Sequence, residues 1–299
     1  MPTVDRITLE LWNGSTYADL TDLVLWNTQS IAGLGVPRVN NLTQRGPSQN
    51  GTTFLGYRYQ ERVIQLVLDG LGTDEASWHD RRAGLVQLFS PSTTLLQLRY
   101  SVPPDKQYQF DCYVSIPPDF STNDRTGYNQ RTVAELRCPD PTAYDPTGIG
   151  VNFGIAGGGT AWALNANWTL NANWTFGTST LNQSQVIAMN AANAAESFPV
   201  ITMAGPITNP RVTNGSTAAF LDFTGYTIGS GAVWTIDTRY ASKSIVDELG
   251  ASQAHKLSDT SSLATFALEP GNNPLTVTGT SITSVTNVSV TYYNRFTGV

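Results

Sequence analysis

One stretch decides the fold of the first half of this chain: Arg62-Val-Ile-Gln-Leu-Val-Leu-Asp69, ended by Gly70-Leu-Gly72. Ile64, Leu66 and Leu68 occupy every second position of the run. This is the period of a β-strand with one buried face. The pattern therefore predicts a strand whose alternate side chains lie in a hydrophobic core.

The next stretch, residues 73–90, predicts an amphipathic helix. Thr73 can cap the free backbone N–H groups, and the carboxylates of Asp74 and Glu75 suit the positive end of the helix dipole. Pro91 ends the helix because it disfavours helical dihedral angles at the preceding residue. We expect the helix to cover one face of a sheet through a single apolar stripe, made of Trp78, Leu85, Val86 and Phe89.

Short alternating stretches surround this strand and helix and predict an antiparallel, mainly β first half. Ile7 to Trp12 alternates and is followed by Asn13-Gly14, a dipeptide typical of tight hairpins. Tyr108 to Ile116 and Gln130 to Arg137 alternate as well. Residues 27–52 contain several Gly, Pro and Asn breakers, so we predict a long loop there. A loop of this length has a function or reaches a neighbouring subunit.

A domain boundary is predicted near residue 140, which gives domains of residues 1–140 and 141–299. The run Cys138-Pro-Asp-Pro141 cannot continue a central strand. Charge usage changes at the same point, from 15 acidic and 12 basic residues in the first domain to 8 and 5 in the second. The second half otherwise consists of short alternating stretches separated by Gly, Pro and Asn turns, which is typical of a β-sandwich.

An internal duplication lies in an Asn- and Trp-rich segment near residues 155–195. Leu164-Asn-Ala-Asn-Trp-Thr169 is repeated at once as Leu170-Asn-Ala-Asn-Trp-Thr175. Because the repeat length is even, the Leu, Ala and Trp side chains of an extended strand would share one face. Trp168 and Trp174 on that face could pack on protein or stack on sugar rings, so they are the candidate carbohydrate-binding residues.

The composition argues against several classes of function. The formal net charge of −6 gives no basic patch for nucleic acid. The chain has neither an apolar run long enough to span a membrane nor a hydrophobic signal segment at its N-terminus, so we expect a soluble product made in the cytoplasm. Cys112 and Cys138 both fall on apolar strand faces and are predicted to be buried free thiols.

The sequence also lacks a recognisable catalytic pattern. His79 and His255 lie in different domains without metal-ligand spacing, and neither a nucleophile elbow nor a phosphate loop is present. Asp222 and Asp237 could pair as in a glycosidase, but nothing in their spacing selects them over ordinary turn or edge residues. We expect no catalytic residues, no metal site and no cofactor, and hence no enzyme activity.

Two sets of segments occur in an order that resembles a known family. The first set is Gly33-Leu-Gly-Val-Pro37, Gly51-Thr-Thr-Phe54, Arg62 to Leu68 and Leu88-Phe-Ser-Pro91. The second set is Phe198 to Gly205, Thr208 to Asn214, Trp234-Thr-Ile-Asp237 and Leu268-Glu-Pro-Gly-Asn272. The first set resembles the N-terminal domain of the siphophage distal tail proteins, and the second set resembles the C-terminal galectin-like domain of the same family.

The resemblance implies a fold and a structural function. It implies a tail-tube-like first domain, built as a β-sandwich or split barrel with one packed helix, and a galectin-like β-sandwich as second domain. It further implies a hexameric ring that joins the tail tube to the tail tip or baseplate. The expected partners are further copies of the chain, the tail tube protein, a tail-tip or tail-associated protein and a receptor-binding protein. We expect assembly in the host cytoplasm and a final location in the virion tail.

The alternative function is a carbohydrate-binding module or a receptor-binding tail component. The galectin-like half and the Trp168/Trp174 face favour it. The helix-bearing first domain argues against it, because a lectin that acts alone would not need this domain.

Overall fold

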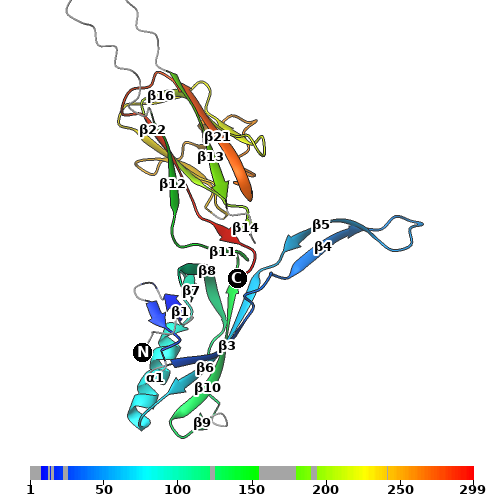
Figure 1. The fold of residues 1–299 in the computed structure, drawn as a ribbon, viewed down its shortest axis with the longest axis vertical. Helices are drawn as coiled ribbons and strands as arrows, with labels where there is room; N and C mark the ends of the chain where they lie inside the picture. The colour runs from blue at the N-terminus through cyan, green and yellow to red at the C-terminus, as the bar shows by residue number, and fades with distance from the viewer. Residues whose placement is uncertain are drawn as a thin grey trace, which may run out of the picture. The chain divides into compact units, whose positions relative to one another are not determined.

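The computed structural model describes residues 8–12, 14, 17–22, 26–121, 125–154, 180–189, 194–240 and 242–299. It is mainly β, as predicted (Figure 1). The chain divides into two units, Met1–Pro146 together with Arg295–Val299 (unit 1) and Thr147–Asn294 (unit 2). The division follows Pro146, whereas the sequence predicts a boundary near 140. Within the described ranges, no helix is long and apolar enough to cross a membrane.

Unit 1 is built around β6 (Arg62–Leu71), the strand predicted from the spacing of its buried leucines and isoleucine. It pairs along its whole length with β10 (Asn129–Cys138) and, on its other side, with β3 (Trp26–Ala32). All pairs are antiparallel, and β8 (Lys106–Ile116) continues the sheet beyond β10. The remaining strands that unit 1 contributes to this sheet are β1 (Thr8–Trp12), β2 (Tyr17–Asp19), β7 (Leu96–Val102), β9 (Arg125–Thr126), β11 (Ala143–Tyr144) and β23 (Arg295–Phe296).

Helix α1 (Glu75–Leu88) begins one residue later than Thr73 would place it, because Asp74 is the capping residue. Its Oδ1 accepts the Ser77 N–H at 2.8 Å, and the Ser77 Oγ accepts the Asp74 N–H at 3.1 Å, which completes a capping box. These two bonds satisfy backbone donors that a helix start otherwise leaves open.

The apolar stripe of α1 is confirmed except at Val86. Trp78, Leu85 and Phe89 are buried as predicted, but Val86 is 50 % exposed and Leu88 is buried in its place. Leu88 follows Leu85 by one turn of the helix and therefore shares its face, whereas Val86 points about 100° away.

The core of unit 1 lies between this stripe and one face of the sheet. Ile64, Leu66 and Leu68 are fully buried there, as the spacing predicts. Cys112 and Cys138 are free and fully buried in the same core, which confirms the prediction for both thiols. A hydrogen bond with the Cys138 thiol, together with burial, raises the pKa of Cys112 above its usual range.

The prediction of a loop over residues 27–52 is wrong. Residues 27–32 belong to β3, and β4 (Val39–Gln44) pairs with β5 (Thr53–Tyr59) in a two-stranded hairpin from Val39↔Tyr59 to Gln44↔Thr53. The breakers lie at the ends of these strands rather than inside them. We call residues 39–59 the arm and residues 33–38 the arm root. Figure 1 shows the arm extending away from the rest of unit 1.

Unit 2 is a β-sandwich, as predicted. Among the described residues, a five-stranded sheet has the order β12-β22-β15-β19-β20, and the other sheet has the order β13-β21-β16-β17 with β18 paired to β16. Buried side chains from both sheets form one core. The strands are β12 (Ile149–Gly154), β13 (Thr180–Met189), β14 (Ala194–Ala195), β15 (Val200–Ala204), β16 (Ile207–Asn214), β17 (Phe220–Asp222), β18 (Thr227–Ile228), β19 (Val233–Asp237), β20 (Ser244–Asp247), β21 (Gly271–Thr280) and β22 (Asn287–Tyr292), with a short 3-10 helix at Ala254–Lys256.

Truncation of Phe89 tests the packing of α1. Phe89→Ala should lower the free energy of unfolding of unit 1 by about 3–5 kcal/mol, because the ring is fully buried. Val86→Ala, on the exposed side of the same helix, should change it by less than about 0.5 kcal/mol. Urea denaturation followed by tryptophan fluorescence measures both variants. Equal small effects would show that the helix packs through a different face.

Candidate functional site

The described residues do not assemble the parts of a metal site. No group of three or more His, Cys, Asp or Glu side chains in the described ranges could hold an ion. His79 lies on the exposed side of α1, 3.4 Å from Glu75. His255 lies in the short 3-10 helix of unit 2.

The two carboxylates considered as a glycosidase pair lie on different sheets of unit 2. Asp237 on β19 makes an ion pair with Arg239 at 2.6 Å. Asp222 on β17 accepts the backbone N–H of Thr224 at 2.9 Å and lies 3.8 Å from Arg211. Each carboxylate is thus engaged locally in a turn or an ion pair, and the two do not face each other as a pair on one sheet.

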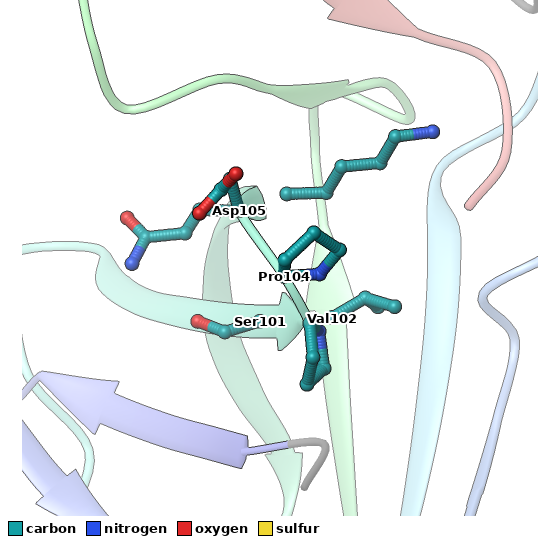
Figure 2. A pocket seen from close by; sticks show the side chains of 7 residues that line it. Ser101, Val102, Pro104 and Asp105 are labelled. Carbon is teal, nitrogen blue, oxygen red and sulfur yellow. The ribbon is translucent and has the colours of Figure 1, made fainter. Parts of the chain in front are cut away.

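A pocket of about 350 Å³ lies at the tip of the β7–β8 hairpin. It is lined by the consecutive residues Ser101 to Gln107, whose side chains Figure 2 shows as sticks. Side chains from a single turn do not converge on one point, so the pocket lacks the convergent polar groups of a small-molecule site.

The candidate carbohydrate-binding residues Trp168 and Trp174 lie outside the described residues. The duplicated hexapeptide that contains them lies there too. Their assignment stays a prediction from the sequence.

The arm presents an apolar surface that the rest of unit 1 does not cover. Phe54 and Leu55 are each 61 % exposed. Further exposed apolar side chains at or near it are Val36, Val39, Leu42 and Tyr57. A two-stranded hairpin is marginally stable by itself, and both of its edges carry backbone groups that can pair with another chain. The arm therefore has the properties of a contact element.

The face of the sheet opposite α1 is a second candidate contact surface. Val133 on β10 points outward between the inward-facing Thr132 and Ala134, and it is exposed. Tyr113 and Ile116 on β8 are exposed as well. Two arginines of β10 form ion pairs: Arg131–Asp69 at 3.0 Å, Arg137–Glu61 at 2.7 Å and Arg137–Glu135 at 3.2 Å.

Opposing effects act on the pKa of the Glu135 carboxylate on this face. Burial alone would raise the pKa of Glu135, but hydrogen bonds from Arg137, Ser115 and Gln65 outweigh it. The net result is a lowered pKa, so Glu135 is ionised at neutral pH. The face thus combines exposed apolar side chains with fixed charges, a mixture that suits specific contacts between proteins.

The arm root is attached to unit 1 through Arg62, whose side chain is only 2 % exposed. Its Nη1 donates to the carbonyl oxygens of Gly33 and Gly35, both at 2.6 Å. Its Nε donates to Pro141 O at 2.6 Å and its Nη2 to Thr297 O at 2.8 Å. Burial lowers the pKa of Arg62, and the nearby Cys138 and Asp140 oppose this effect.

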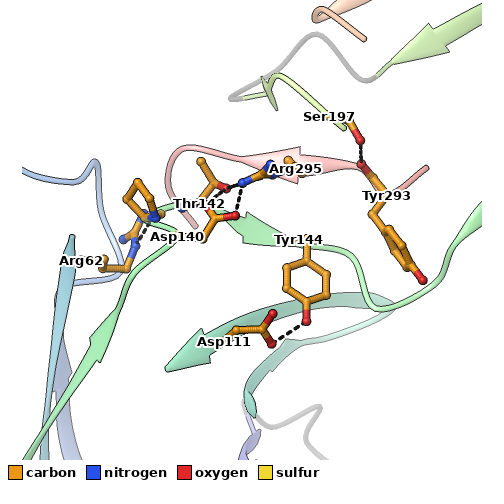
Figure 3. A network of polar contacts seen from close by, with 9 residues as sticks. Arg62, Asp111, Asp140, Thr142, Tyr144, Ser197, Tyr293 and Arg295 are labelled. Carbon is orange, nitrogen blue, oxygen red and sulfur yellow. Dashed lines mark hydrogen bonds and ion pairs between the residues drawn. The ribbon is translucent and has the colours of Figure 1, made fainter. Parts of the chain in front are cut away.

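Residues 295–299, which we call the strap, contact both Arg62 and the arm root. The Val299 N–H donates to Leu34 O at 3.0 Å. Arg295 pairs with Asp140, and its Nε donates to Thr142 Oγ1 at 3.0 Å, as Figure 3 shows.

Tyr144 lies beside these residues in Figure 3 and donates to Asp111 Oδ1 at 2.7 Å. Burial, together with the negative charge of Asp111, raises its pKa. The phenol therefore stays protonated and keeps donating to the carboxylate at neutral pH.

Comparison with known proteins supports the resemblance drawn from the sequence. Residues 18–133 match the family described as phage tail protein RIFT-related domain. No curated protein sequence matches the chain significantly.

Two solved structures share the fold of the whole chain. The SPP1 Dit protein, described as a paradigm of hub adsorption apparatus in Gram-positive infecting phages, has a TM-score of 0.64 at 15 % identity, with 97 % of this chain and 99 % of that chain covered. A chain of the phage p2 baseplate in its activated conformation with Sr has a TM-score of 0.52 at 12 % identity, with 98 % and 100 % covered. The chain thus has the fold of a distal tail protein, and the resemblance to that family is confirmed.

Sequence reasoning missed the arm and the role of Arg62. The signal for the arm was present in Thr53-Phe-Leu-Gly-Tyr-Arg-Tyr59, because aromatic and β-branched residues favour strands. The signal for Arg62 was its phase, since it falls on the same face of β6 as the buried Ile64.

Replacement of Arg62 by a side chain without donors tests how the arm root is held. Arg62→Met should lower the free energy of unfolding of unit 1 by about 3–5 kcal/mol, because buried carbonyl groups lose their donor. Arg131→Met removes an arginine whose side chain is 60 % exposed and should cost less than about 1 kcal/mol. Chemical denaturation compares the two, and similar losses would contradict a buried anchoring role for Arg62.

Proposed function

We propose that this chain is a structural protein of a siphophage tail, and that copies of it form a hexameric ring joining the tail tube to the tail tip or baseplate. The observation that carries the proposal is the tail-protein family match over residues 18–133. The fold shared with the SPP1 Dit protein over nearly the whole chain supports it. A structural role also agrees with the local engagement of the acidic side chains in unit 2.

The arm and the outward sheet face are the expected contacts between neighbouring subunits. The arm exposes Phe54 and Leu55, which water solvates poorly, and its unpaired edges can accept a further strand. The sheet face adds ion pairs that fix the orientation of a partner. A specific interface of ordinary size buries about 1,200–2,000 Å² and can still be weak in dilute solution.

The two units have different expected partners. Unit 1, which contains all of the matched residues 18–133, builds the ring and contacts the tail tube protein. Unit 2 is a galectin-like sandwich that contacts a tail-tip or tail-associated protein, and a receptor-binding protein is a further candidate partner. The protein assembles in the host cytoplasm and remains in the virion tail.

Changes on the arm test its role in the ring. Phe54→Ser combined with Leu55→Ser should abolish ring formation by the 32.3 kDa chain, because both side chains would lose their apolar contact with the neighbour. The melting temperature should stay the same, since both side chains are exposed in the single chain. Val186→Ser, at an equally exposed position of unit 2, is the matched control. Light scattering at high protein concentration and negative-stain images measure assembly. Intact rings in the double variant would contradict this role of the arm.

Labelling of virions tests the location of the protein. Gold-labelled antibodies should mark a single collar where the tail tube meets the tip. Labels along the whole tube would instead identify a tube subunit, and labels confined to fibres would identify a receptor-binding component. Either of these results would overturn the proposed position.

A further inference from the structure

The strap and the arm root meet through main-chain groups. Arg62 binds Gly33 O and Gly35 O of the root and Thr297 O of the strap with one guanidinium group. Independently of Arg62, the Val299 N–H donates to Leu34 O. The two segments are thus joined in two ways. Arg62 donates to carbonyl groups of both segments, and Val299 of the strap donates directly to Leu34 of the root.

Two glycines permit close approaches here, Gly33 between the root and β6 and Gly298 between the strap and the root. A Cβ atom at Gly33 would lie 2.0 Å from the carbonyl oxygen of Val63, and its backbone has a φ of +97°. A Cβ atom at Gly298 would lie 3.2 Å from the carbonyl carbon of Gly35 and 3.3 Å from the nitrogen of Val36. A side chain at 298 would therefore be crowded against the root, and the strap or the root would have to shift by a few tenths of an ångström to accommodate its Cβ atom.

The strap is held by a short ladder and by polar contacts of Arg295, Thr297 and Val299. It forms one short ladder with β11, in which Ala143 pairs with Phe296 and Tyr144 with Arg295. Phe296 and Val299 are only partly buried against the core. Local units with few buried contacts open more readily than the whole domain. Opening of the strap would break these contacts but none of the backbone pairs between β6 and β10.

We propose that the strap is a releasable clamp on the arm root, so that the arm is held in one pose only while the strap is docked on Arg62. This inference rests on the proposed function, because it takes the arm to be an assembly element. Two states follow from it. With the strap docked, the root is fixed by Arg62 and by Val299; with the strap withdrawn, the root keeps Arg62 alone and loses the contact at Leu34.

Hydrogen exchange measured by mass spectrometry on the full chain tests the clamp. Gly298→Val and deletion of residues 297–299 should each speed amide exchange in the arm root and the arm by about tenfold, the effect expected when one or two hydrogen bonds are lost. Exchange in β6, β10 and α1 should stay unchanged. The control is Gly84→Ala on α1, where an added Cβ meets nothing within 4 Å. Unchanged exchange at the root in both strap variants would overturn the proposal.

A second variant separates the strap's own contacts from the influence of unit 2. A flexible Gly-Ser insertion between Asn294 and Arg295 leaves every strap contact in place and should leave exchange at the root unchanged. Faster exchange in this variant would show that unit 2, and not the strap, holds the root. Ring formation by the unaltered chain is scored separately in negative-stain images. Failure to form rings would count against the proposed function, whereas the exchange rates alone decide the clamp.

Discussion

The buried guanidinium of Arg62 is the constraint around which unit 1 is arranged. Moving a cation out of water is costly unless its donors are satisfied, and here main-chain carbonyls from three separate segments of the chain supply the acceptors. The Phe110 ring, 5.1 Å away, adds a favourable contact with its face. Segments that would otherwise be independent surface turns are thereby fixed at one end of the central strand.

The sequence predicts what depends on local pattern. The spacing of Ile64, Leu66 and Leu68 places β6 in the core, and the stripe through Leu85 and Phe89 orients α1. Val86 was misassigned because a helix stripe has a limited width, and the burial of Leu88 decided which side of it faces the sheet. The arm escaped prediction because breakers at Gly33 to Pro37 and at Gly46 to Gly51 flank the short strand β4 and precede β5, which made the whole stretch resemble a loop. Contacts between distant residues, such as Arg62 with Thr297, leave no local pattern at all.

The candidate functional surfaces likewise could be predicted only where they depend on local sequence pattern. Asp222 and Asp237, which the sequence offered without a selective spacing, lie on different sheets of unit 2. The contact surfaces, in contrast, became visible only in three dimensions. An exposed Phe54 cannot be told from a buried one by residue type, and Val133 has the same alternation as a core valine. Only the position of α1 on one side of the sheet shows that the other side is left uncovered.

The distance along the chain between Arg62 and Thr297 has a consequence for synthesis. Their hydrogen bond spans 235 residues, and the whole of unit 2 lies between them. At a translation rate of roughly 5–20 residues per second, Thr297 is synthesised on the order of 10–50 s after Arg62. A chain that stops early therefore leaves the root of its arm incompletely bonded. The root of the arm therefore gains this hydrogen bond only after the whole of unit 2 has been synthesised.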